Sequence, residues 1–335
     1  MTESRGERVK DAAHLPALDG LRALSILAVL ACHMLPLGPA EWKGNATAGY
    51  MGMSVFFALS GFLITRFLWD TDDIGQFFVR RIARIVPLVL IVSILYGLFL
   101  EGRPDTVLAI NLYVLNYWHE AIVPSVSPLW SLSIEMQFYI VIGLSVLAFK
   151  RRGFWVIPLA ALTVTLLRIS TGTFGSIVTH LRVDEILAGS LLALFWLHRD
   201  QGQVKRVWTY LPKLFWVLLV LWALACWPPS SAWGYLRPYL SALLIGSVLA
   251  MNGGWQTSVL SWGSLRYVAA ISFALYVWHS PFRHGWFDEG SGFEVYLIKR
   301  PIAFVCIFAL AHLSTYYLEK PLIKVAKNWG KAKNH

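Results

Sequence analysis

The sequence predicts an all-α fold, a polytopic transmembrane bundle of about ten helices. Of the 335 residues, 57% are hydrophobic and only 14% are charged, a composition that is not typical of soluble globular proteins. Apolar runs long enough to cross a bilayer recur from one end of the chain to the other. Basic residues gather in alternate connecting segments, as they do in multi-pass membrane proteins.

The predicted helices follow one another with short connections. We expect them at about 17–38, 48–69, 83–101, 129–149, 153–170, 180–198, 211–228, 235–252, 265–283 and 294–318. The segment from Thr106 to Trp118 is apolar but short and has polar flanks, so we expect a packed external loop or a re-entrant piece there. No linker or internal repeat interrupts the pattern. We therefore expect one domain over 1–335, with its core at about 15–323 and no appended soluble domain.

The net charge of +10 could suit a nucleic-acid-binding protein, but its distribution favours another explanation. An even number of helices places both termini on one side of the membrane. If that side is cytoplasmic, 21 of the 29 Lys and Arg residues lie there and eight lie outside. This split follows the positive-inside rule. We therefore expect cytoplasmic termini and no nucleic-acid partner. The first sixteen residues are polar, so the first helix is expected to be retained and not cleaved as a signal peptide.

Ionisable residues inside apolar segments are candidates for function, because they are costly in hydrocarbon. Arg22 and His33 lie eleven residues apart on the first helix, so they share one face about 16 Å apart. His33 either forms a structural hydrogen bond between helices or acts as a base near neutral pH. Glu135 either pairs with an arginine or orients the imidazole of His33. His279 is a further buried candidate.

Two groups of arginines add to this set. Arg80, Arg81 and Arg84 are a topology determinant, and they could also grip phosphates at the cytoplasmic mouth. Arg182 begins the sixth helix beside acidic residues and either forms an ion pair across the bundle or lines a cavity. The three cysteines have no metal-binding spacing, so no metal site is expected.

Several kinds of protein are disfavoured by missing motifs. The sequence has no GxSxG elbow, no phosphate-binding GxxxxGK[ST] loop and no GxGxxG after a strand. A serine hydrolase and an ATP-driven pump are therefore not indicated. A transporter or flippase for a lipid-linked sugar or small polar solute stays open as an alternative, although the missing inverted repeat disfavours it. A structural scaffold is a third possibility.

The chain resembles the acyltransferase 3 family of integral membrane acyltransferases, which acylate hydroxyl groups of bacterial glycans and some secondary metabolites. The resemblance rests on seven blocks in order: LPALDGLRALSILAVLACH, GYMGMSVFFALSGFLIT, FFVRRIARIVPL, PLWSLSIEMQFYI, RVDEILAGSLLALF, ISFALYVWHSPF and TYYLEKPLI. Two positions depart from the usual pattern. An acidic residue often precedes FFALSGF, where this chain has Met53-Ser54-Val55, and Met136 follows Glu135 where a second glutamate is common.

The resemblance implies a membrane O-acyltransferase in the bacterial plasma (inner) membrane, with acetyl as the common acyl group. It implies Arg22 and His33 as the signature pair with His33 as the catalytic base, and Glu135 as a catalytic residue beside them. Arg81, Arg84 and Arg182 are implied as binding residues for acyl-coenzyme A, the expected donor in the form of acetyl-CoA or another acyl-CoA. The expected acceptor is a glycan, a lipid-linked saccharide or a glycosylated small molecule, with membrane lipid as the surroundings. Direct transfer and an acyl-enzyme relay both stay open.

Overall fold

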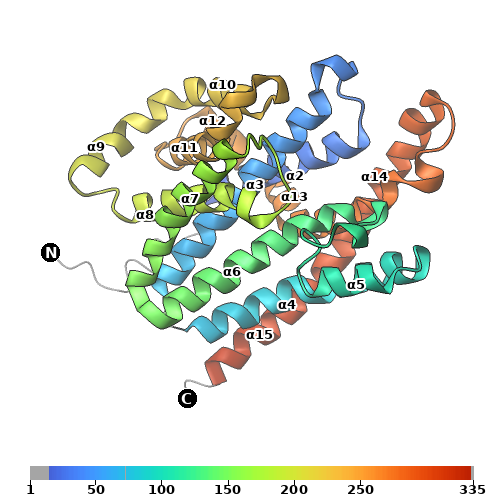
Figure 1. Ribbon diagram of the computed structural model, residues 1–335, viewed down its shortest axis with the longest axis horizontal. Helices are drawn as coiled ribbons and strands as arrows, with labels where there is room; N and C mark the ends of the chain where they lie inside the picture. Colours follow the sequence, from blue (N-terminus) through green and yellow to red (C-terminus); the bar gives the residue numbers. More distant parts are fainter. Residues whose placement is uncertain (1–14, 72, 333–335) are drawn as a thin grey trace.

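The fold is a bundle of helices, seen in a computed structural model that describes residues 15–71 and 73–332 (Figure 1). Among these residues there is no strand. The predicted position of the termini concerns in part residues 1–14 and 333–335, which lie outside the described residues. The helices are α2 (Pro16–Met34), α3 (Gly44–Asp70), α4 (Ile74–Val92), α5 (Pro104–Asn111), α6 (Trp130–Phe149), α7 (Val156–Ser170), α8 (Asp184–Leu197), α9 (Gly202–Tyr210), α10 (Phe215–Cys226), α11 (Arg237–Leu249), α12 (Trp255–Leu260), α13 (Gly263–Trp278), α14 (Arg300–Leu313) and α15 (Lys320–Ala332).

Each of the ten predicted ranges overlaps one of these helices. Within the described part of the chain, six helical stretches are long and apolar enough to cross a membrane. They are Pro16–Met34, Ala40–Asp70, Ile74–Leu100, Pro124–Ser170, Gly202–Cys226 and Glu294–Asn328. The helices α8, α11 and α13 are shorter, at 14, 13 and 16 residues. The protein is therefore helical and of the multi-pass membrane type. The count of ten crossings stays a prediction.

The third predicted helix begins nine residues earlier than expected. Asp73 precedes α4, and its carboxylate accepts a hydrogen bond from the backbone N–H of Gln76 at 2.8 Å. A side chain of this kind satisfies an unpaired N–H at the helix start. The segment FFVRRIARI is therefore part of α4, and its three arginine side chains are half-buried. Eight residues in π-helical geometry, Ser93–Leu100, extend this helix at its other end.

The segment predicted as a packed loop or re-entrant piece is partly helical. The short helix α5 covers its first half, and turns follow to Trp118. Arg103 fixes the start of α5, because its guanidinium donates to the Asp105 carboxylate at 2.9 and 2.6 Å. This hydrogen bond lowers the pKa of Asp105 to about 2. A second contact, from Arg103 to the carbonyl of Glu120 at 2.5 Å, ties α5 to the turn that precedes α6.

The helix α3 packs against α2 on one side and α8 on another (Figure 1). Glycines allow both approaches. A Cβ atom on Gly61 would lie 1.9 Å from the carbonyl oxygen of Ile186, and one on Gly189 would lie 1.9 Å from that of Ala58. On the other side, Ser25 donates a hydrogen bond to the carbonyl of Gly52 at 2.6 Å. Small residues and polar side chains commonly hold membrane helices together in this way. The helices α2, α3 and α8 therefore form a closely packed centre of the bundle.

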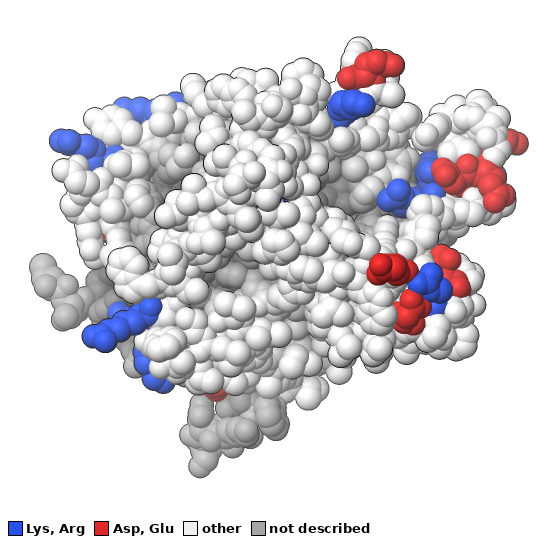
Figure 2. All heavy atoms as spheres, viewed as in Figure 1, with Lys and Arg blue, Asp and Glu red and all other residues white. Residues whose placement is uncertain are grey.

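Acidic side chains lie mostly at one end of the bundle, with basic side chains among them, and basic side chains prevail at the other end (Figure 2). On the face shown, acidic side chains gather over α5 and the segment before α14, and basic side chains dominate the opposite end. Exposed members of the acidic end are Glu101, Glu120, Glu289 and Glu294, and those of the basic end are Lys150, Arg151, Arg152, Lys205 and Arg206. The bundle is therefore electrically asymmetric along its length.

Candidate active site

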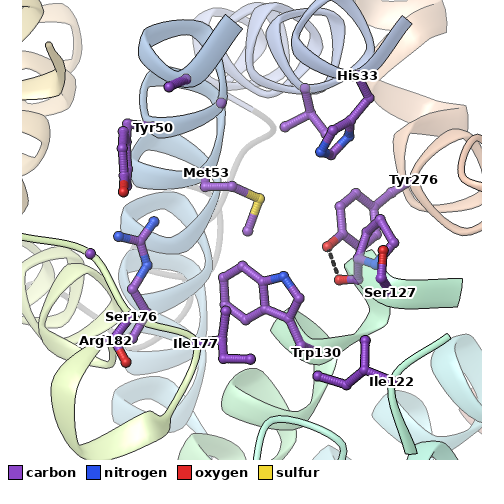
Figure 3. Close-up of a pocket in the computed structure, with 15 residues that line it drawn as sticks. His33, Tyr50, Met53, Ile122, Ser127, Trp130, Ser176, Ile177, Arg182 and Tyr276 are labelled. Carbon is purple, nitrogen blue, oxygen red and sulfur yellow. Dashed lines mark hydrogen bonds between the residues drawn. The ribbon is translucent and has the colours of Figure 1, made fainter. Parts of the chain in front are cut away.

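A cavity of about 480 Å³ opens between α2, α3, α6 and α13, and we call it the histidine cavity (Figure 3). His33 from α2 is directed into it, and Arg182 lies on the opposite side. Its walls carry aromatic rings. They are those of Tyr50 from α3, Trp130 from α6 and Tyr276 from α13. Its volume falls in the range of about 300–1,000 Å³ that is common for small-molecule sites.

His33 belongs to a histidine pair. Its Nδ1 atom lies 2.9 Å from Nε2 of His279, and the two rings are stacked with centroids 5.0 Å apart. His279 is fully buried at the end of α13, where Pro281 follows and the helix cannot continue. The Nδ1 atom of His279 lies 2.6 Å from the backbone carbonyl oxygen of Tyr276. Three groups, from two helices that are far apart in the sequence, are thus joined in one chain of hydrogen bonds.

The direction of each hydrogen bond in this chain follows from the carbonyl group. A carbonyl oxygen can only accept, so Nδ1 of His279 carries the hydrogen. In a neutral imidazole the other nitrogen then has a free lone pair, so Nε2 of His279 accepts from Nδ1 of His33. The Nε2 atom of His33 is consequently left without a hydrogen. A nitrogen in this state can take a proton from a hydroxyl group, which is the property a general base needs.

A second cavity, of about 520 Å³, lies at the other end of α2, and we call it the arginine cavity. Arg22 lines it, eleven residues and about 16 Å along the helix from His33. Its charged lining side chains are Arg22, Arg84, Arg266, Lys320, Asp19 and Glu319. Four cations and two acids give this cavity an excess of positive charge. It is therefore suited to an anionic ligand.

The two arginines of the R-x-x-R motif occupy different surroundings. Arg84 lines the arginine cavity, whereas Arg81 does not. The guanidinium of Arg81 instead lies over the rings of Tyr139, at 5.7 Å, and Phe77, at 5.8 Å. It also interacts with the carboxylate of Glu135. The structure therefore brings Arg22 and Arg84 together at a cavity wall and places Arg81 behind them.

Glu135 lies between the two cavities and not beside His33. It is 5% exposed on α6 and faces the hydroxyl groups of Ser60 and Tyr139. Its electrostatic partners in the described chain include Arg22, Arg81 and Arg84, and it also interacts with Tyr276 of the histidine cavity. No hydrogen bond in the described chain joins Glu135 to His33, whose ring partner is His279. The orienting role expected for Glu135 stays a prediction, and the ring contact that the structure shows for His33 is with His279.

Arg182 also stands apart from its predicted group. It lines the histidine cavity, while Arg84 lines the other one. Its Nη2 atom lies 3.3 Å from the Glu185 carboxylate, and its guanidinium lies 5.5 Å from the ring of Tyr50. The arrangement separates Arg182 from the expected donor-binding arginines. In the residues that the structure describes, no group of three or more His, Cys, Asp or Glu side chains could hold a metal ion.

The helices and the site together define a class: a multi-pass helical protein with one histidine of a pair facing one cavity and arginines facing another. Comparison with known sequences gives the family. The family model described as an acyltransferase domain matches residues 15–320, so the chain belongs to the acyltransferase 3 family. This confirms the resemblance seen in the seven sequence blocks.

The chain is also similar to several proteins that are named as O-acetyltransferases. It is 29% identical over 98% of its length to a "Putative O-acetyltransferase" of Staphylococcus aureus (strain COL), of which the match covers 61%. It is 26% identical over 93% of its length to peptidoglycan O-acetyltransferase OatA of Listeria monocytogenes, of which the match covers 56%. A "Putative peptidoglycan O-acetyltransferase" of Bacillus subtilis is 28% identical over 92% of the chain and matched over 55% of its own length.

The chain spans about three fifths of the length of these curated relatives. The expectation that it has no further domain therefore stays a prediction. No solved structure matches the chain.

Proposed function

We propose that the protein is a membrane O-acyltransferase that moves an acyl group, most simply acetyl, from acyl-CoA to a hydroxyl group of a glycan or glycosylated metabolite. Family membership and the names of the O-acetyltransferase relatives support this assignment. The observation that carries the proposal is the hydrogen-bond chain from Tyr276 through His279 to His33, because it leaves a basic nitrogen at a cavity wall. Two of the relatives are named for peptidoglycan, so a cell-wall glycan is a reasonable acceptor to test first.

The arginine cavity is proposed as the site for the phosphates of the donor. Arg22, Arg84 and Arg266 can form charge-assisted hydrogen bonds with phosphate oxygens, and Lys320 adds a further positive charge. Behind this wall, Glu135 neutralises part of the arginine charge and holds Arg81 beside Tyr139. In the proposed complex the thioester end of the donor would extend along α2 toward His33.

The chemical step is proposed as direct transfer. The Nε2 atom of His33 takes the proton of the acceptor hydroxyl, whose oxygen attacks the thioester carbonyl carbon. A C–O bond forms, the C–S bond breaks, and the proton passes from His33 to the departing thiolate of coenzyme A. His279 keeps the required nitrogen of His33 unprotonated before the reaction. An acyl-enzyme relay would use the same nitrogen as the nucleophile.

The proposed orientation places the arginine cavity toward the cytosol and the histidine cavity toward the outer face of a bacterial plasma membrane. Both termini would then be cytoplasmic. The basic side chains at one end of the bundle and the acidic side chains at the other support this direction (Figure 2). Donor and acceptor would approach from opposite sides, with α2 spanning the distance between them.

Thioester consumption by the purified full-length protein tests the proposal. We expect acetyl-CoA to be cleaved in the presence of cell-wall glycan, and His33→Ala to lower the rate by about 10²- to 10⁴-fold. His198→Gln is the matched control, because His198 bonds to the carbonyl of Leu194 at the end of α8 and lines neither cavity. A transporter or flippase would leave acetyl-CoA intact. Cleavage that persists in His33→Ala would remove the proposed mechanism.

A further inference from the structure

A cluster of buried charges lies directly behind the histidine cavity and is not electrically balanced. Arg168 forms an ion pair with Asp184. Glu185 receives Nε of Arg237 at 2.8 Å on one oxygen and faces Nη2 of Arg182 at 3.3 Å with the other. All five side chains are at most 4% exposed. Three cations and two acids leave one positive charge in excess, since no other carboxylate among the described residues pairs with them.

The excess charge is carried by Arg182. Arg168 and Arg237 each have a closer carboxylate, and both also donate to the carbonyl of Phe174, at 2.8 and 3.2 Å. Arg182 has only the longer contact to Glu185. Two of its nitrogens, Nε and Nη1, have no hydrogen-bond partner in the described chain, whereas Arg168 and Arg237 each have one such nitrogen. Isolated charges are costly to bury, so an unbalanced buried cation indicates a missing anion.

Arg182 is also the member of the cluster that reaches the cavity. Among the described lining residues it is the one permanently charged side chain. Figure 3 shows it across the cavity from His33, with Met53 between them and Trp130 on the floor. A group held by Arg182 is therefore separate from the group that reacts at His33. The flat rings of Trp130 on the floor and of Tyr50 beside Arg182 offer apolar faces on which the C–H faces of a sugar ring can pack.

We infer that the histidine cavity binds an acceptor saccharide that carries a carboxylate, with the carboxylate at Arg182 and the reacting hydroxyl at His33. This inference rests on the proposed acyl transfer for the identity of the reacting group. It replaces the expected part of Arg182 in donor binding. A single carboxylate supplies one negative charge, which is the charge that the cluster lacks, and guanidinium groups bind carboxylates through charge-assisted hydrogen bonds.

The charge balance makes Arg182 a suitable residue to mutate. Arg182→Gln removes the excess cation and leaves two cations, Arg168 and Arg237, with two acids. The Glu185 carboxylate keeps its 2.8 Å contact with Arg237. The variant is therefore expected to fold with an unchanged or higher thermal midpoint. Arg182→Lys keeps the charge and serves as the conservative variant.

The experiment measures binding of two matched sugars to the purified full-length protein in lipid nanodiscs. Methyl β-D-glucuronide carries a carboxylate, and methyl β-D-glucoside has the same ring without one. We expect the wild type to bind the glucuronide about tenfold more tightly or better, and this preference to weaken with added salt. Arg182→Gln should abolish the preference, and Arg182→Lys should retain part of it. The KM for acetyl-CoA should stay unchanged in both.

Each other result contradicts the inference in a distinct way. Equal binding of the two sugars by the wild type would show that the cavity does not select a carboxylate. A preference that survives Arg182→Gln would place the anion elsewhere, and a raised KM for acetyl-CoA would return Arg182 to the donor. Arg206→Gln is the matched control, because Arg206 is exposed on α9 and lines neither cavity. Sugar binding requires no acyl transfer. The binding experiment can therefore be interpreted even if the proposed enzymatic function proves wrong.

Discussion

The Nδ1 atom of His33 lies 2.9 Å from the Nε2 atom of His279, although 246 positions separate the two residues in the chain. This contact joins the end of α2 to the end of α13 and sets the direction of the hydrogen bond at His33. Because His279 itself donates to the carbonyl of Tyr276, its Nε2 atom can only accept. The tautomer of His33 is therefore set by the backbone of a neighbouring helix.

Substitution of His279 should lower kcat and leave KM for acetyl-CoA unchanged. His279→Ala removes the acceptor, so His33 is free to place its hydrogen on the nitrogen that faces the cavity. We expect a loss of about ten- to a hundredfold in kcat, less than the 10²- to 10⁴-fold effect of removing the base itself. Steady-state thioester kinetics on folded protein measure both constants.

The conservative variant separates orientation from simple packing. The side-chain oxygen of glutamine can accept a hydrogen bond near the place of the imidazole Nε2 atom, so His279→Gln should recover much of the rate. Asparagine is too short to do so. If His279→Gln and His279→Ala have equal kcat values, the pair contributes stability alone and the tautomer argument fails.

Glu135→Gln should affect the stability of the bundle and the KM for acetyl-CoA more than kcat. The substitution removes a buried carboxylate beside Arg22, Arg81 and Arg84, and the loss of one partner from a buried ionic group costs about 3–5 kcal/mol. Thermal unfolding in detergent should show a lower midpoint. Glu120→Gln, on an exposed turn, is the control. A fall in kcat with an unchanged midpoint and KM would instead support the orienting role first expected for Glu135.

Much of the fold could be predicted because apolar length is a local property of the sequence. The ranges of the helices follow from it, with errors where a local cap such as Asp73 acts before the apolar run begins. The face shared by Arg22 and His33 could also be predicted, because both lie on one straight helix. These predictions need only the rise and rotation of a helix.

Relationships between helices could not be predicted in the same way. His279 was visible as a buried ionisable residue, but its partner depends on how α13 packs against α2. The same limit applies to Arg182, which shares a residue type with Arg84 and faces a different cavity. The sequence did mark both residues as ionisable groups beside apolar helices, because His279 directly follows α13 and Arg182 lies just before α8. The distances from each of them to its neighbours are a property of the packed bundle.

Arg84→Gln should raise the KM for acetyl-CoA about tenfold while kcat at saturation stays close to that of the wild type. Arg84 lines the arginine cavity, and removal of one charge-assisted hydrogen bond to phosphate weakens ground-state binding. Acetyl-CoA that lacks the phosphate on its ribose should show the same rise with the wild type if Arg84 binds that group. In this case the variant should no longer distinguish the two donors.

Arg206→Gln is the matched control for this prediction. Arg206 is exposed on α9 and lines neither cavity, so its loss removes one positive charge from the same end of the bundle without touching the proposed site. An equal rise in KM for Arg206→Gln would mean that Arg84 acts only through the overall field of the basic end. A reduced kcat with unchanged KM would remove Arg84 from the donor site.

The close approach of α3 and α8 gives a prediction about how the bundle supports the site. Gly61→Ala and Gly189→Ala should each lower the thermal midpoint, because the new Cβ atom would lie 1.9 Å from a backbone carbonyl oxygen on the facing helix. Backbone atoms cannot rotate away, so α8 must shift, at a cost of at least about 1–3 kcal/mol. The control is Gly292→Ala, where no atom lies within 4 Å of the added carbon.

The shift of α8 should also reach the histidine cavity. Asp184 and Glu185 form the first turn of this helix and hold the arginine cluster in place. Movement of these carboxylates changes the position of Arg182, so both glycine variants should lose the preference for methyl β-D-glucuronide before they lose the capacity to bind acetyl-CoA. Thermal unfolding and sugar binding on the same preparation measure the two effects. Unchanged midpoints in both variants would show that the helices tolerate a wider spacing than the structure has.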